Sequence, residues 1–382
     1  MSQWAAWAAI LGLTTTVSRS DFTAPGEFSS PPAQHWVRAL PGPVFPAAQH
    51  TELGAPLIDG TSIYLGAAGS DALYELNRRD GALEGSFAAS GPVQAAPVIV
   101  GQRIYFTDSA GYTWCYLLEG GEPQWRHYGG APILASPLVS DGQVFVSNVG
   151  GVSYALDAET GELQWRHEQE VDISRRSQLE LYGAPTPVLS GSAVLVGAHD
   201  GSVVALDRAK GLRLWQRKVG EGRYPDLIGA PVVREGDVIV AGFTEPLLSL
   251  NLETRNVRWR IDAGGVQAPM VDGRDLYHGG SDSKLRKLDA VTGSVAWTWE
   301  CEAGGTLGQP IKTPAGVMVA SSEGSVYLID EDSGVQRWEY RPGHTLDGIA
   351  ASIAVEGRQA VLVTNAGNVI SLIVPELGGR DE

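Results

Sequence analysis

Short hydrophobic runs alternate with pairs of turn-forming residues along nearly the whole chain. In one clear block, apolar runs cover residues 143–147 and 152–156, and turn pairs stand at Asp141-Gly142, Gly150-Gly151 and Thr160-Gly161. Runs this short, separated by glycine-containing pairs, are typical of β-strands joined by tight hairpins, because glycine readily takes the positive φ that such turns need. The block therefore predicts antiparallel strands rather than a helix.

The same block recurs along the chain at spacings of 38 to 50 residues. A repeat near this length, with four strands in each copy, is typical of a β-propeller in which each copy forms one blade. A proline opens the first strand, where a missing N–H is tolerated, at Pro56, Pro97, Pro137, Pro187, Pro231, Pro269 and Pro310, with Ser352 in the eighth copy. A tryptophan marks the fourth strand at Trp125, Trp165, Trp215, Trp259, Trp297 and Trp338.

The first and last segments of the repeat region together make up one four-stranded copy. The eighth copy, residues 349–374, has only three strands, whereas the run 33–38 around Trp36 resembles the fourth strand at 162–167. We therefore expect an all-β fold over residues 34–375, an eight-bladed β-propeller of four-stranded antiparallel blades closed by an N-terminal strand in the last blade. The tryptophans, Trp36 included, are expected to wedge neighbouring blades together. Gly85 takes this place in the first blade, so its junction is expected to be the least well packed.

The segments outside the repeat predict export. The apolar run 4–13 is too short to span a bilayer and has the length of a signal-peptide core, although no Lys or Arg precedes it. We interpret residues 1–18 as a candidate signal peptide, 19–33 as a flexible leader and 376–382 as a tail. No cysteine follows the apolar run, so no lipid anchor is evident, and the expected location is the periplasm or cell envelope.

The charge of the chain argues against two classes of partner, and its two cysteines argue against a disulfide. The formal net charge of −16, with 44 acidic against 28 basic side chains, disfavours binding to nucleic acid or to anionic membrane surfaces. No other segment approaches the length of a transmembrane helix. Cys115 and Cys301 fall on blades two and six, and we expect two separate thiols rather than a disulfide.

Signals of catalysis are weak. The seven histidines are scattered singly, with no paired spacing for a metal, and no nucleophile or phosphate-loop motif stands out. His127 and His167 follow a tryptophan by two residues and reflect repeat position, whereas His199 and His278 are expected at the surface near second hairpin turns. The acidic run 330–334 is interpreted as a third hairpin turn rather than a calcium loop. We expect no catalytic residue, metal or cofactor.

The run Ala155-Leu156-Asp157-Ala158-Glu159-Thr160-Gly161-Glu162-Leu163-Gln164-Trp165 and its variants resemble the repeat of the pyrroloquinoline-quinone-type propellers. Within that group the chain most resembles the BamB-like propellers of the outer-membrane β-barrel assembly machinery. Eight blades, a chain near this length and an N-terminal closing strand agree with that family. Two loops, 179–186 before blade four and 223–233 before blade five, sharpen the resemblance. It implies that these loops bind the barrel-assembly subunit. Tyr182 and Ile228 replace charged residues of the family pattern, while Asp226 is kept, so the partner must be co-adapted or different.

These two connections are also the longest between blades, and both are expected on the face that carries the second hairpin turns. Aromatic and aliphatic anchors beside arginines are the composition of a protein-binding hot spot. The alternative is that the leucines pack locally on the blade tops. The candidate partner-binding residues are Arg175, Arg176, Leu179, Leu181, Tyr182, Arg223, Tyr224, Asp226 and Leu227.

The sequence thus favours a non-catalytic, exported protein-binding scaffold, monomeric within a complex, whose role is outer-membrane β-barrel protein assembly. Two alternatives stay open. A small-ligand or glycan-binding propeller would use the central channel. A quinone-dependent dehydrogenase would need adjacent cysteines, a calcium-binding carboxylate set and large insertions, whereas Cys115 and Cys301 are isolated.

Overall fold

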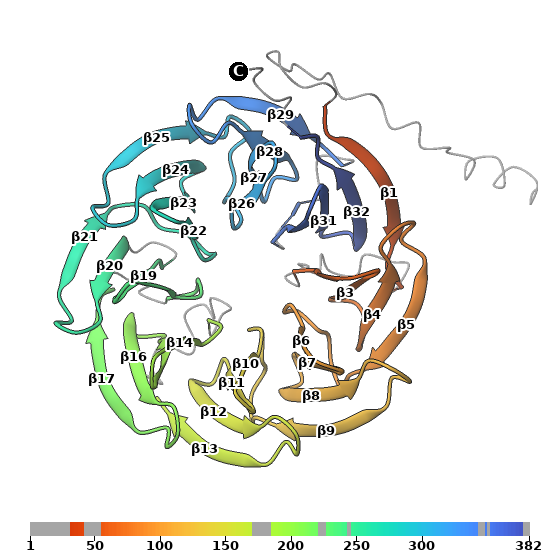
Figure 1. The fold of residues 1–382 in the computed structure, drawn as a ribbon, viewed down its shortest axis with the longest axis vertical. Helices are drawn as coiled ribbons and strands as arrows, with labels where there is room; N and C mark the ends of the chain where they lie inside the picture. The colour runs from red at the N-terminus through yellow and green to blue at the C-terminus, as the bar shows by residue number, and fades with distance from the viewer. Residues whose placement is uncertain are drawn as a thin grey trace, which may run out of the picture.

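A computed structural model describes residues 31–41, 55–169, 185–220, 227–242, 246–342, 348–349 and 352–376. The described residues form eight separate sheets, each of four antiparallel strands, and the sheets stand side by side in a ring (Figure 1). The predicted all-β, eight-bladed propeller is therefore confirmed. The described residues include no helix of the length and hydropathy needed to cross a bilayer.

The strands follow the repeat in chain order. Blades one to four consist of β2 (Leu57–Asp59), β3 (Ser62–Gly66), β4 (Ala72–Asn77) and β5 (Leu83–Ala88); β6 (Val98–Val100), β7 (Arg103–Thr107), β8 (Tyr112–Leu117) and β9 (Pro123–Tyr128); β10 (Leu138–Ser140), β11 (Gln143–Ser147), β12 (Val152–Asp157) and β13 (Leu163–Glu168); and β14 (Val188–Ser190), β15 (Ala193–Gly197), β16 (Ser202–Asp207) and β17 (Arg213–Lys218).

The second half of the ring repeats this arrangement. Blades five to eight consist of β18 (Val232–Arg234), β19 (Asp237–Val240), β20 (Leu247–Asn251) and β21 (Val257–Ile261); β22 (Met270–Asp272), β23 (Asp275–Gly279), β24 (Lys284–Asp289) and β25 (Val295–Glu300); β26 (Ile311–Thr313), β27 (Gly316–Ala320), β28 (Val326–Ile329) and β29 (Gln336–Tyr340); and β30 (Ala354–Glu356), β31 (Gln359–Val363), β32 (Asn368–Ile373) and β1 (Ala33–Ala39).

The ring closes where the sequence predicted it would. Strand β1 pairs antiparallel with β32, with Trp36 opposite Ser371 and Val37 opposite Ile370. Strand β1 therefore forms the outer strand of the last blade, beside the C-terminal strands (Figure 1). Because β1 comes from the opposite end of the chain, blade eight is held together by non-local backbone hydrogen bonds.

Burial explains the sequence pattern of the strands. The second and third strands of each blade lie between neighbouring blades, so β11 and β12 are buried along almost their whole length and read as continuous apolar runs. The fourth strands lie at the outside and alternate between buried and exposed positions, as β13 does. The tight turns between strands use glycine at positive φ, for example Gly142 (φ 75°) and Gly161 (φ 72°).

Tryptophan docking joins consecutive blades. The indole N–H of Trp165 in blade three donates to the carbonyl of Arg208 in blade four at 2.8 Å. A methyl group at Gly211 in the same hairpin would lie 2.5 Å from Cε3 of Trp165, so the ring covers this glycine directly. The same pairing of indole, carbonyl and glycine occurs at five junctions, formed by Trp36 with Arg78 and Gly81, Trp125 with Ala158 and Gly161, Trp165 with Arg208 and Gly211, Trp259 with Ala290 and Gly293, and Trp297 with Glu331 and Gly334.

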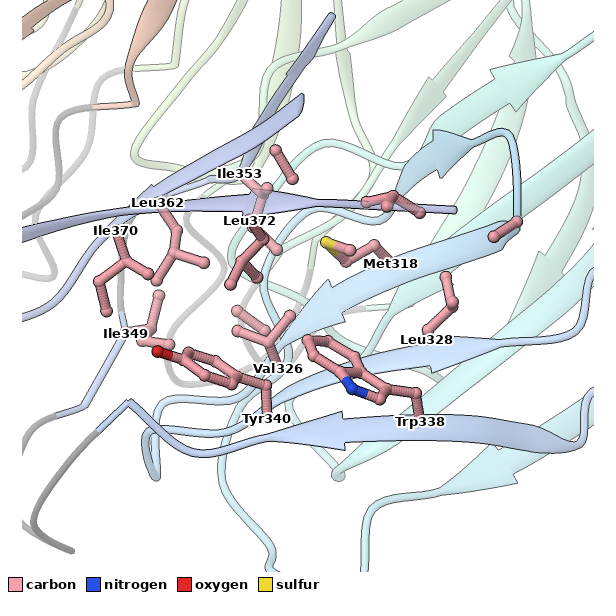
Figure 2. Close-up of a cluster of buried hydrophobic side chains, with 14 residues drawn as sticks. Met318, Val326, Leu328, Trp338, Tyr340, Ile349, Ile353, Leu362, Ile370 and Leu372 are labelled. Atoms are coloured by element: carbon pink, nitrogen blue, oxygen red, sulfur yellow. The ribbon is translucent and has the colours of Figure 1, made fainter. Parts of the chain in front are cut away.

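Two other tryptophans dock differently. Trp215 faces Arg255, whose guanidinium carbon lies 5.9 Å from the indole centroid and which takes φ 61° where the other hairpins have glycine. Trp338 stacks on Tyr340 with ring centroids 5.7 Å apart, in the core between blades seven and eight (Figure 2). Blade eight ends with β1 instead of a third hairpin, so among the described residues no hairpin glycine faces Trp338.

The cysteines and the acidic turn lie as the sequence predicted. Cys115 and Cys301 are buried free thiols, on β8 and directly after β25, which confirms two separate thiols. Residues 330–335 form the turn between β28 and β29. There the Asp330 carboxylate accepts hydrogen bonds from the backbone N–H groups of Asp332 and Ser333, which is the behaviour of a turn-forming aspartate.

Candidate protein-binding rim

The structure describes the base of the candidate rim but not most of its predicted contact residues. Eight of those residues lie outside the described residues: Arg175, Arg176, Leu179, Leu181, Tyr182, Arg223, Tyr224 and Asp226. The ninth, Leu227, is described, as are the strands and turns on both sides of each connection.

The connection between blades three and four begins and ends beside second hairpin turns. The backbone N–H of Gln169, which follows β13, donates to the carbonyl of Gly151 at 2.9 Å. Where the chain returns, the ring of Pro185 lies against Gly197, since a methyl group at Gly197 would be 2.7 Å from Cγ of Pro185. Both ends of residues 170–184 are therefore fixed on one face of the ring.

The connection between blades four and five shares this base. The backbone N–H groups of Val219 and Gly220 both donate to the carbonyl of Gly201 at 2.9 Å. After the connection, the N–H of Leu227 donates to the carbonyl of Ala198 at 3.5 Å. Residues 198–201 are the second hairpin turn of blade four, so the expected shared face of inter-blade connections and second hairpin turns is confirmed for these stems.

Leu227 itself packs inside the protein. Its side chain is 2 % exposed and belongs to a core cluster with Val219 and Leu248. A methyl group at Gly197 would lie 3.0 Å from Cβ of Leu227, so the leucine also covers the end of β15. For this residue the structure shows the local-packing alternative, because a leucine buried between blades four and five is not offered to a partner.

A small polar hollow lies at the base of the rim, between blades three and four. Ser147 and Ser153 share a hydrogen bond of 2.9 Å between their hydroxyls, and the Asn148 amide donates to the carbonyl of Gly129 at 2.7 Å. The side-chain oxygen of Asn148 accepts from the N–H of Val152, which fixes the turn. The hollow was missed from the sequence because its polar residues come from two blades; it is lined by Ser147, Asn148, Gly151, Ser153, Gln169, Val196, Gly197 and His199.

The histidines differ from their expected positions in one case. His278 is fully buried, not at the surface, because its ring fills the space beside Gly265 and approaches the carbonyl of Ala263 at 3.1 Å through Nε2. Burial lowers the pKa of His278 to about 4, so the ring is neutral at pH 7 and Nε2–H donates to that carbonyl. Burial also lowers the pKa values of His127 and His167, which face inward from their fourth strands.

The titratable groups of the described residues were compared with the requirements of a metal site and of a reactive thiol. Among these residues no group of three or more His, Cys, Asp or Glu side chains is placed to hold a metal ion. Burial raises the pKa of Cys115 to about 11, so this thiol is a poor nucleophile at pH 7. What the described residues do show is that the ends of both long connections are fixed beside second hairpin turns.

Comparison with known proteins places the chain in a family. The profile of the family described as outer membrane protein assembly factor BamB matches residues 113–299 and 276–376. The chain is 26% identical to the BamB of Salmonella typhimurium over 163 residues, which cover 41% of this chain and 42% of that protein. It is 25% identical to the BamB of Kangiella koreensis over 220 residues, covering 53% and 54%. The chain thus spans about half the length of the curated relatives it matches.

Solved structures support the same fold. The BamB of Moraxella catarrhalis superposes with a TM-score of 0.74 at 17% identity, covering 90% of this chain and 99% of that one. A quinohemoprotein alcohol dehydrogenase of Pseudomonas putida superposes with a TM-score of 0.66 at 13% identity, covering 92% and 78%. These identities speak for the fold alone, whereas the profile match covers more than half of the sequence. The chain belongs to the outer membrane protein assembly factor BamB family.

Proposed function

We propose that this protein is a non-catalytic scaffold for outer-membrane β-barrel protein assembly, working in the periplasm as one component of a complex. Its family and the relatives it matches are described as assembly factors, which supports this role over that of an enzyme. The dehydrogenase superposition carries no comparable weight, because one propeller fold hosts both binding and redox proteins.

The observation that carries the proposal is the common base of the two long connections. Residues 170–184 start from Gln169 on blade three and return at Pro185 against Gly197, and residues 221–226 start and end on the turn 198–201. Loops held at both ends on rigid strands lose less entropy on binding than free loops do. The described stems therefore place both connections on one face of the ring, where they can bind one partner without any covalent chemistry.

The proposed contacts are Leu179, Leu181 and Tyr182 from the first connection and Arg223, Tyr224 and Asp226 from the second, with Arg175 and Arg176 beside them. Leu227 is left out because it is buried. The proposed partner is a barrel-assembly subunit of the same organism. Since Tyr182 and Ile228 stand where the family pattern has charges, we expect this contact to depend more on apolar anchors than on ion pairs.

The test uses the full chain and the purified barrel-assembly subunit of the same organism, with binding measured by calorimetry. The double substitution Leu181→Asp and Asp226→Arg is expected to weaken binding about 100-fold, since loss of two anchors costs several kcal/mol. Leu212→Asp is the matched control, because Leu212 is an exposed leucine at the third hairpin of blade four, on the opposite face.

The control separates binding from folding. The melting temperatures of both variants are expected to stay within about 2 °C of the unsubstituted protein, as for exposed positions in general. Equal loss of binding in the control would show that the effect is not specific to the rim, and a much lower melting temperature of the double variant would show that these side chains stabilise the fold instead.

A further inference from the structure

The junction between blades one and two differs from the others at the place where an indole usually sits. Gly85 stands on β5 in the position that Trp165 holds on β13, since Gly85 pairs with Glu75 as Trp165 pairs with Ala155. In the facing hairpin, a methyl group at Gly121 would have no heavy atom of a described residue within 4 Å. The equivalent Gly211 would have Trp165 at 2.5 Å, so the space over Gly121 is open.

The backbone does not require a glycine at position 85. Gly85 is not among the residues with positive φ, so a side chain is permitted there. A methyl group at this position would meet only the Glu75 side chain, with Oε2 at 3.4 Å. The open space is therefore bounded by Gly85 and Glu75 on blade one and by Gly121 on blade two.

Glu75 directs a carboxylate at this space. Its Oε1 accepts hydrogen bonds from the Ser62 hydroxyl and the Tyr64 hydroxyl, both at 2.8 Å, while Oε2 lies toward Gly85. Burial raises the pKa of Tyr64 to about 12, which keeps its hydroxyl protonated and donating. At the junctions made by Trp165 and Trp215, the residue in the place of Glu75 is Ala155 or Ala205. At the junctions made by Trp125, Trp259 and Trp297, the same place is held by Cys115, Ser249 and Lys287. Glu75 is thus the acidic residue at this place, and its oriented carboxylate stands beside the open space.

We propose that this position, between blades one and two on the face of the third hairpins, binds an arginine side chain of a partner protein. A guanidinium is planar, as an indole is, and can lie over Gly121 in the same way. Its N–H groups can donate to Oε2 of Glu75 and to the carbonyl of Leu118. Leu118 has the place in its hairpin that Arg208, the acceptor for Trp165, has in blade four.

The chemistry favours arginine over other occupants. A lysine ammonium could pair with Glu75 but would not cover the flat hairpin backbone, and an inserted tryptophan would leave the carboxylate without a charged partner. The net charge of −16 attracts basic partners in general, and Glu75 gives that attraction one defined position. The site lies on the face opposite the candidate rim, so it would engage a second region or a second protein.

The experiment is an amide NMR titration of the full chain with acetyl-Gly-Arg-Gly-amide. We expect saturable shifts at the amides of Gly85 and Gly121. The peptide with citrulline in place of arginine keeps the shape but loses the charge, and is expected to bind at least about 10-fold more weakly. The lysine peptide is expected to bind more weakly than the arginine peptide.

Two variants locate the site. Glu75→Gln keeps an acceptor for Ser62 and Tyr64, so the fold is retained, and it should weaken the arginine peptide at least about 10-fold. Gly85→Trp should fill the open space with the chain's own indole and abolish the shifts. Glu84→Gln on the exposed side of β5 is the control and should leave binding unchanged. Melting curves confirm folding of each variant.

The opposing results are equally definite. No saturable shift at Gly85 and Gly121 up to about 50 mM peptide would overturn the proposal, as would equal binding of the citrulline peptide. Unchanged binding in Glu75→Gln would show that the peptide binds elsewhere. None of these results depends on partner capture by the rim, so failure here leaves the proposed assembly function standing.

Discussion

The junction between blades three and four and the junction between blades one and two solve the same packing problem in different ways. In the first, Trp165 covers Gly211 and donates to Arg208 at the outer part of the interface. In the second, Gly85 leaves that position open, and aromatic rings fill the rest of the interface. Phe87 packs edge-on against Tyr116 at 5.5 Å, and the Tyr116 hydroxyl donates to the carbonyl of Ala88 at 2.8 Å.

The difference shows which contacts a blade junction requires and which contacts are only usual in this repeat. A junction needs a large buried apolar contact, and the cluster at blades one and two has it through Tyr64, Phe87, Phe106, Trp114 and Tyr116. It does not need that contact at the indole position. The expectation that the Gly85 junction is the least well packed therefore applies to its outer part, where the described residues leave open space, and not to its core.

The largest effect is expected from Trp165→Ala. The substitution removes a buried ring from between two blades and leaves the carbonyl of Arg208 without its donor, at a cost of about 3–5 kcal/mol. The melting temperature measured by circular dichroism should fall by several degrees. A fall as small as that of an exposed substitution would mean that the outer indole is as dispensable here as it is at Gly85.

Two equivalent glycines allow the cost of a collision with the indole to be measured apart from the cost of backbone strain. Gly211 and Gly121 occupy equivalent hairpin positions at φ 67° and 62°, but only Gly211 faces a tryptophan. Gly121→Ala should cost about 1 kcal/mol, the strain of the left-handed conformation alone. Gly211→Ala should cost about 2–4 kcal/mol, because the added methyl also collides with Trp165. Equal losses of unfolding free energy in urea would remove the role assigned to the ring.

The smallest effect is expected from Arg255→Gly in blade five. Arg255 takes φ 61° at the hairpin position where most blades have glycine, and glycine relieves that strain by about 1 kcal/mol. The loss of the contact between the guanidinium and Trp215 offsets part of this gain. The net change should be a rise in melting temperature of no more than a few degrees, and a clear fall would mean that the cation–π contact outweighs the strain.

Most of the fold could be predicted because each copy of the repeat carries its own strands, turns and tryptophan. The closure of blade eight could be predicted by counting strands. The eighth copy lacks a fourth strand, and the extra strand around Trp36 supplies it. The glycines that form the third hairpin turns are also the residues that the indoles cover. The same glycine in the sequence therefore predicts both the turn and the tryptophan contact.

The parts that could not be predicted are contacts between blades. The sequence shows that Leu227 follows a long connection, but its burial depends on Leu248 of blade five, which approaches it only when blades four and five pack. His278 is buried for the same reason, because its ring fits against Gly265 from the preceding connection. Glu75 reads as an ordinary polar strand residue until Gly85 is placed opposite it. The periodicity of the sequence predicts the conformation of each strand. It does not predict which side chains of the neighbouring blade will contact that strand.

The pairing of β1 with β32 has a consequence for synthesis. A ribosome makes β1 first and β32 last, so the strand that completes blade eight waits unpaired until the final residues of the ring exist. A chain that stops before β32 leaves β1 and the apolar face of Trp36 without their neighbour. Closure of the ring therefore requires that synthesis has passed β32, and a product that stops before β32 leaves an unpaired strand edge exposed to proteases.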